Sequence, residues 1–182
     1  MKKIIAITLL VGLSFVGFGQ KYLTQTGQIN FYSFAEKEDI TAVNNQVSSV
    51  LNTENGELAF SLLMKAFSFE KALMQEHFNE KYVESDKYPK ATFKGSIIDF
   101  DAAKITDKAT TVKVQGKLTI HGVTKDITTT GTLQKTSSGN IIAKASFIIN
   151  LDDYNIAIPS AVKNKVSNKI EIKVNLEYEK MG

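Results

Sequence analysis

The chain has 182 residues, of which 43% are hydrophobic and 23% are charged, and it contains no cysteine. This length and hydrophobic content are enough for one domain with a sizeable core. The lack of cysteine excludes disulfide-stapled folds, thiolate metal sites and cysteine nucleophiles. All 22 basic residues are lysine. Because arginine supplies the bidentate contacts typical of phosphate and guanine recognition, nucleic acid is not expected as a partner.

The beginning of the chain has the pattern of an export signal. Two lysines precede an apolar run, Ile4–Val16, and Gly17 and Gly19 are small residues of the kind that signal peptidase reads. The run is shorter than the roughly 20 residues of a membrane span, so no stable span is expected. We therefore expect residues 1–19 to be cleaved and residues 20–182 to form one periplasmic or secreted domain. Without the two lysines, 20 lysines stand against 19 acidic residues, a net charge of +1.

Alternation of apolar and polar residues is the dominant pattern in the rest of the chain. Such alternation is typical of antiparallel strands with one buried face and one wet face. Eight strands are enough to close a barrel, and the fold class expected is therefore mainly β, with a single eight-stranded antiparallel barrel. The segments predicted as strands are 29–36, 40–51, 57–67, 91–101, 111–120, 123–134, 140–151 and 169–180.

Two segments interrupt the strands. Met74, Phe78 and Tyr82 recur at helical spacing, which predicts an amphipathic helix over Glu70–Val83 that ends before the Tyr88-Pro89 pair. Its apolar stripe is expected to cover an open end of the barrel as a lid carried by Met74 and Phe78, or else to pack on the outer wall. A second, short helix is expected after Ser160, capped by that serine, with Ala161, Val162 and Val166 turned inward.

The chain has two histidines, and neither is placed for obvious chemistry. His121 and Gly122 lie between two strands, where histidine tolerates a left-handed backbone and glycine adopts it freely, so a hairpin turn is predicted. His77 lies on the predicted helix near Glu76 and Glu80, without an HExxH or similar zinc pattern. No G-x-S-x-G elbow or glycine-rich phosphate loop is present. We therefore expect no metal, no cofactor and no enzymatic activity.

Three stretches together resemble the YceI-like family of exported polyisoprenoid-binding proteins. They are "SDKYPKATFKGSI", "VQGKLTIHGVTKDI" and "ASFIINLDDYNIAIPSAV", which occur in the family's order over essentially the whole predicted mature chain. The most specific parts are Y-P-x-A-x-F, from Tyr88 to Phe93, and G-x-L-T-x-x-G-V-T, from Gly116 to Thr124. The chain departs from the family at "LDDYNI", where many members have a basic residue ahead of an aromatic-Gly-Ile turn.

The resemblance implies a lipocalin-like barrel whose bore holds a long isoprenoid chain. The expected function is binding of a polyisoprenoid or an isoprenoid quinone for storage or transport, by a monomer or homodimer. Two alternatives stay open. One is an envelope structural or stress protein with a filled core, and the other is an enzyme acting on an isoprenoid lipid, with His121 or His77 as acid or base.

The parity of each strand predicts which residues line the bore. Small residues on the inward faces (Gly95, Gly116, Gly131, Ala143 and Ala145) favour leftover space over a filled core. Apolar residues in phase with the buried face of their strand are predicted to contact the ligand: Phe60, Leu62, Phe93, Ile97, Leu118, Ile120, Ile127, Phe147, Ile149 and Val174.

Overall fold

The computed structural model describes residues 20–181, so the predicted export signal lies outside the described residues. Alternating burial runs along most of the chain and produces a single antiparallel sheet. Its strands are β1 (Lys21–Phe34), β2 (Asp39–Asn52), β3 (Glu57–Leu63), β4 (Ser68–Phe69), β5 (Lys90–Ile97), β6 (Thr110–Ile120), β7 (Val123–Lys135), β8 (Ile141–Asn150) and β9 (Lys169–Lys180).

The sheet closes into the predicted eight-stranded barrel. The strand order is β1-β9-β8-β7-β6-β5-β3-β2, and pairing between β1 and β2 joins the two edges. The two-residue strand β4 only adds a short pairing to β2, at Ala42 and Val43. Closure gives every wall strand a neighbour on both sides, although β2–β3 and β7–β8 are paired over only part of their length.

The inward face changes parity within β1 and β2. In β1, the buried positions shift from Tyr22 and Thr24 to Gly27 and Ile29, and the register with β2 is irregular on both sides of Gly27. An extra residue of this kind is a β-bulge, which bends a strand and strengthens its twist. The bulge explains why the polar run around Gly27 still belongs to a continuous strand.

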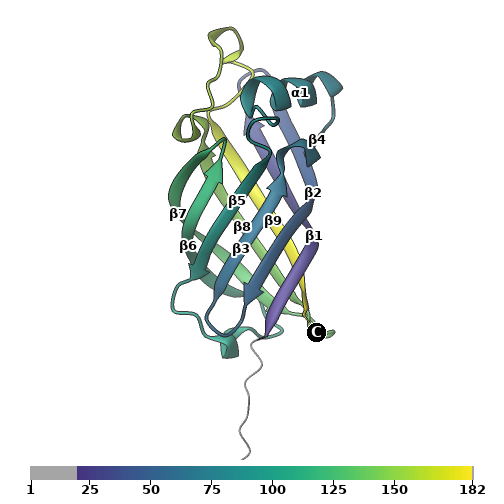
Figure 1. Ribbon diagram of the computed structural model, residues 1–182, viewed down its shortest axis with the longest axis vertical. Helices are drawn as coiled ribbons and strands as arrows, with labels where there is room; N and C mark the ends of the chain where they lie inside the picture. The colour runs from purple at the N-terminus through teal and green to yellow at the C-terminus, as the bar shows by residue number, and fades with distance from the viewer. Residues whose placement is uncertain (1–19, 182) are drawn as a thin grey trace, which may run out of the picture.

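The two ends of the barrel differ (Figure 1). The helix α1 (Ala72–His77) and its continuation η2 (Phe78–Tyr82), a π-helical turn, lie over what we call the upper end. Both ends of the described chain meet at the lower end, where the Met181 amide donates to the Lys21 carbonyl at 2.8 Å. Within residues 20–181, no helix has the length and apolar character needed to cross a membrane.

The wall is incompletely paired between β7 and β8. Their register runs only from Gly131 opposite Ala145 to Lys135 opposite Ile141, in the lower part of the barrel. Higher up, the 3-10 turn η4 (Leu151–Tyr154) contacts β7. This turn therefore covers the place where the two strands separate.

Several predicted boundaries are wrong. The strand predicted to begin at Ile29 begins at Lys21, before the bulge, and the one predicted to run to Asp101 ends at Ile97. The strand predicted to run to Phe67 ends at Leu63, because the 3-10 turn η1 (Met64–Ala66) follows and the Met64 amide donates to the Pro89 carbonyl.

The two predicted helices are present in shorter form. The amphipathic helix spans 72–82 rather than 70–83. The second is the single 3-10 turn η5 (Ser160–Val162), preceded by Pro159 rather than capped by the Ser160 side chain. Val162 and Val166 face a cavity as predicted, whereas Ala161 is exposed.

Candidate functional site

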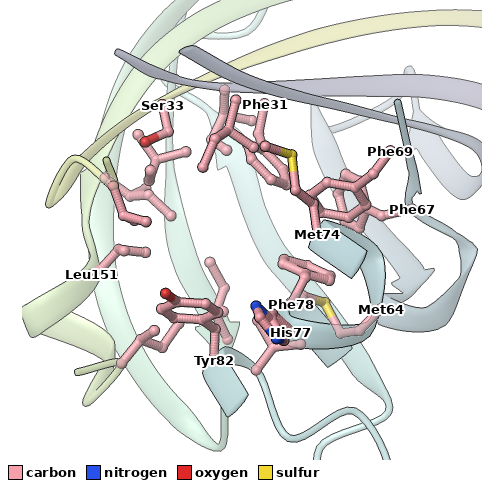
Figure 2. Close-up of a pocket in the computed structure, with 18 of the residues that line it drawn as sticks. Phe31, Ser33, Met64, Phe67, Phe69, Met74, His77, Phe78, Tyr82 and Leu151 are labelled. Atoms are coloured by element: carbon pink, nitrogen blue, oxygen red, sulfur yellow. The ribbon is translucent and has the colours of Figure 1, made fainter. Parts of the chain in front are cut away.

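The upper half of the barrel encloses a cavity of about 460 Å³ beneath α1 and η2, which we call the upper cavity (Figure 2). Its walls are almost entirely aliphatic and aromatic, and they come from the barrel strands, from α1 and from the loop between β8 and β9. A volume of this size lies in the range of small-molecule sites.

Four phenylalanines form one side of the upper cavity. Phe31 on β1 contacts Phe67, Phe69 and Phe78, with ring centroids 5.5, 5.5 and 5.7 Å apart. The Phe69 and Phe78 centroids are 5.0 Å apart. Figure 2 shows these rings gathered beside Met74. Because Phe78 belongs to the helical segment, the cluster holds that segment against the barrel rim.

A second contact ties the helix to the rim from outside. The Lys71 ammonium, immediately before α1, donates to the Glu38 carboxylate at 2.8 Å, and Glu38 lies in the loop between β1 and β2. This hydrogen bond lowers the pKa of Glu38 and raises the pKa of Lys71. Both groups are exposed enough for solvent to weaken the pair, so it positions the helix more than it stabilises the fold.

Polar groups are few in the upper cavity. They come from Ser33, the Glu38–Lys71 pair, His77, Tyr82 and Lys165. Burial raises the pKa of the Tyr82 hydroxyl above its ordinary value. The Ser33 hydroxyl oxygen accepts from the Ser167 amide at 2.9 Å and so fixes the β8–β9 loop beside the cavity.

His121 occupies the predicted turn between β6 and β7, with φ of 51° at His121 and 74° at Gly122. Its side chain does not line the upper cavity but binds two other segments. Nδ1 lies 3.1 Å from the Tyr154 carbonyl oxygen, and Nε2 lies 2.8 Å from the Glu84 carboxylate. A neutral imidazole has only one N–H. Both contacts are therefore satisfied together only when the ring, or Glu84, carries an additional proton.

The lower half of the barrel is nearly filled. Gly95 on β5 lies opposite Gly116 on β6, and a Cβ atom on either glycine would lie 2.6 Å from Cζ of Phe93. The Phe93 ring therefore occupies the space above this glycine pair, and it stacks on Phe60 with centroids 5.1 Å apart. Below the rings lies a small cavity of about 70 Å³, which we call the lower cavity.

A hydrogen-bonded chain closes the lower half. The Ser49 hydroxyl donates to the Ala59 carbonyl oxygen at 2.9 Å, so the Tyr178 hydroxyl, 2.7 Å away, donates to the Ser49 oxygen. Tyr178 is only 2% exposed. These two buried hydroxyl groups are thus paired, as burial requires.

Comparisons with known proteins give the family. A model of the YceI-like domain matches residues 14–178. The chain belongs to the YceI-like family. A search of curated protein sequences finds no significant match.

Solved YceI-like structures share the fold at low sequence identity. A polyisoprenoid-binding domain from Saccharophagus degradans, implicated in plant cell wall breakdown, is 20% identical with a TM-score of 0.77, over 90% of this chain and 99% of that one. BcnA of Burkholderia cenocepacia is 14% identical with a TM-score of 0.69, over 84% and 96% of the chains. A Campylobacter jejuni YceI protein is 19% identical with a TM-score of 0.61, over 78% and 84%.

All ten residues predicted to contact a ligand line one of the two cavities of this YceI-like barrel. Six line the upper cavity: Phe60, Leu62, Leu118, Ile120, Phe147 and Ile149. The other four line only the lower cavity: Phe93, Ile97, Ile127 and Val174. The predicted lid residues Met74 and Phe78 line the upper cavity from above. Contact of any of these residues with a ligand stays a prediction.

The sequence interpretation named Phe78 but missed the other three phenylalanines on the aromatic side of the upper cavity. Phe31 is in phase with Ile29 on β1, so alternation within that strand was a usable signal for it. Phe67 and Phe69 follow the end of β3, where the alternating pattern has stopped. No local pattern indicates that they turn back into the barrel of this YceI-like chain.

The departure from the family pattern at "LDDYNI" is accommodated by the backbone. Asn155, in the position of the family's glycine, adopts a left-handed conformation with φ of 56° after η4. Asparagine is among the few residues that tolerate this region. The neighbouring Tyr154 and Ile156 are both buried, so the turn keeps its place against the barrel.

Proposed function

We propose that this YceI-like protein binds a long hydrophobic lipid, of polyisoprenoid or isoprenoid quinone type, in the upper cavity for storage or transport. The observation that carries the proposal is an apolar cavity of about 460 Å³ with few polar groups in its walls. The fold neighbour from Saccharophagus degradans, described as a polyisoprenoid-binding domain, supports this ligand class. A structural protein with a filled core has less support, because the upper half of the barrel is hollow.

The energetics suit a carrier of apolar molecules. A ligand that buries about 600 Å² of apolar surface gains on the order of 15 kcal/mol before costs. Lost translational and rotational freedom offsets about 4–15 kcal/mol of that gain. The remainder is compatible with retention during storage and with release when a lid opens.

The position of the polar groups orients the ligand. The tail would lie among the apolar side chains of the barrel strands, such as Leu118 and Ile149, and a polar head would lie near Tyr82 and His77 of the helical segment. The Tyr82 hydroxyl would donate a hydrogen bond to a carbonyl or hydroxyl oxygen of the head group. This binding role, rather than catalysis, is the function proposed, and His77 serves in it as part of the cavity wall.

Export is part of the same proposal. Residues 1–19 have the composition of a cleaved signal peptide, which would deliver the protein to the periplasm or to the medium. A carrier in such an aqueous compartment shields an insoluble lipid from water. Cell fractionation of the full chain, together with the mass of the mature N-terminus, tests the location and the cleavage after Gly19.

Lipid content of the purified protein tests the binding function. Organic extraction followed by mass spectrometry should recover an isoprenoid lipid in about one-to-one ratio with the protein from its own host. A protein that emerges empty and takes up no added prenyl alcohol or quinone would overturn the proposal.

A matched pair of variants connects the lipid to the upper cavity. Ala91 on β5 lines the upper cavity, so Ala91→Phe should fill part of that space and eject the lipid. Ala59 on β3 is exposed on the outer surface of the barrel, so Ala59→Phe should retain it. Equal lipid content in both folded variants would show that the lipid binds elsewhere.

A further inference from the structure

We propose that Phe60 and Phe147 form a partition across the barrel that limits how deep the lipid tail reaches and so selects its length. This inference rests on the lipid-binding function proposed above. Among residues 20–181, Phe60 and Phe147 alone line both the upper and the lower cavity. The boundary between hollow and nearly filled barrel therefore runs through these two rings.

The two rings come from opposite walls. In the closed strand order, β3 and β8 are separated by three strands on either side, so Phe60 on β3 faces across the bore toward β8, which carries Phe147. Neighbours support each ring. Phe60 stacks on Phe93 with centroids 5.1 Å apart, and Phe147 lies opposite Ile172 in the register with β9.

The support behind Phe60 is itself fixed. The Phe93 ring lies against the Gly95–Gly116 pair, so it has no free space behind it. Phe60 therefore has no room to swing toward β5. A tail that reaches the partition meets a supported aromatic ring rather than a yielding side chain.

Space exists beyond the partition, in the separate lower cavity that both rings border. The lower cavity of about 70 Å³ is bordered by the small residues Gly131, Ala143 and Ala145. Loss of either partition ring would join this space to the upper cavity of about 460 Å³. A longer tail would then bury additional methylene groups in the lower half.

Length selection follows from the energy of each buried carbon. Each methylene moved from water into the barrel raises affinity roughly fourfold. In the wild-type protein this gain should stop once the tail touches the partition. In a protein without the partition, the gain should continue to longer tails.

Binding of a prenyl alcohol series tests the partition. The dissociation constants of farnesol, geranylgeraniol and solanesol, in order of increasing length, are measured for the wild-type protein, Phe60→Ala and Phe147→Ala. Either variant should bind solanesol at least about tenfold more tightly than the wild type, while farnesol changes by less than about threefold. Thermal melts show which variants are folded, and the two variants act on separate strands in case one does not fold.

Two further variants separate the partition from general enlargement. Phe31→Ala removes the same ring from the upper cavity alone, so it should change the affinities of all three alcohols by a similar factor. Adding Ala145→Leu to Phe60→Ala fills the space beyond the partition and should abolish the gain for solanesol.

The outcomes distinguish the two proposals. If folded Phe60→Ala and Phe147→Ala show the same length dependence as the wild type, the partition is refuted while lipid binding stands. If Phe31→Ala favours solanesol as much as Phe60→Ala does, volume rather than position sets the preference, and the partition is again refuted. If the wild type binds no prenyl alcohol at all, the proposed function itself fails.

Discussion

Alkaline pH should destabilise the barrel through a single buried tyrosine. Burial raises the pKa of Tyr178 from 10.0 to about 12, although its hydrogen bond to Ser49 opposes this effect. The phenol donates its proton to the Ser49 oxygen, whose own proton is engaged by the Ala59 carbonyl. A phenolate at this position would be almost completely removed from solvent. A Ser49 hydroxyl turned to donate to it would leave the Ala59 carbonyl and offset only part of that cost, so the folded state retains the proton.

The direction and size of this loss of stability follow from the pKa of Tyr178 in the unfolded and in the folded chain. In the unfolded chain the phenol ionises at about pH 10, whereas in the folded barrel it stays neutral until about pH 12. Tyr178 therefore contributes fully to the free energy of unfolding below pH 10 and loses that contribution as pH rises toward 12. The difference corresponds to about 3 kcal/mol, at about 1.4 kcal/mol for each pH unit between the two values.

Urea unfolding of the wild type and Tyr178→Phe, followed by circular dichroism below pH 10 and near pH 12, measures this effect. Below pH 10 the variant should be less stable by about 1 kcal/mol, the usual net value of one hydrogen bond. Near pH 12 the wild type should have lost about 3 kcal/mol more than the variant. Burial also raises the pKa of Tyr82 and Tyr154. Both tyrosines are present in the wild type and in the variant, so their effect on stability cancels in the comparison. An equal loss in both proteins would refute the assignment to Tyr178.

Four further outcomes are expected. Met74→Ala with Phe78→Ala should speed release of a bound prenyl lipid more than the lower melting temperature accounts for, and unchanged release rates would show that the helical segment is scaffold. Gly95→Ala should cost about 3 kcal/mol in urea unfolding, because the new Cβ would clash with the Gln115 carbonyl and the Phe93 ring; a near-neutral effect would mean that β5 and β6 separate easily. A double-mutant cycle of His121→Ala and Glu84→Ala should give a coupling free energy of about 1–2 kcal/mol, whereas zero coupling would make the contact incidental. His121→Asn should leave lipid retention unchanged, because the imidazole lies outside the upper cavity.

Local alternation was enough to predict the barrel, because each strand buries one face and a period of two survives in the sequence. Phe147 and Ile149 on β8 and Ile170 on β9 follow that period without interruption, and the structure confirms the strands that carry them. The helix was predictable for the same kind of reason, because Met74 and Phe78 recur at the spacing of one turn. The beginning of β1 was missed because its bulge at Gly27 reverses the parity.

The sequence alone determined which residues face inward, whereas only the tertiary structure decided which of them enclose space. Gly95 and Gly116 suggested a hollow bore, but Phe93, on the same face of β5, fills the space above both. The large cavity arises instead where Phe67 and Phe69, beyond the last regular residue of β3, turn back beneath the helix. The face of the sheet on which a side chain lies depends on its position within its own strand, so the local sequence pattern predicts it. Whether a cavity remains depends on the volumes of the rings that enter the bore from opposite walls. Which rings share the same level of the bore is decided only when the barrel closes.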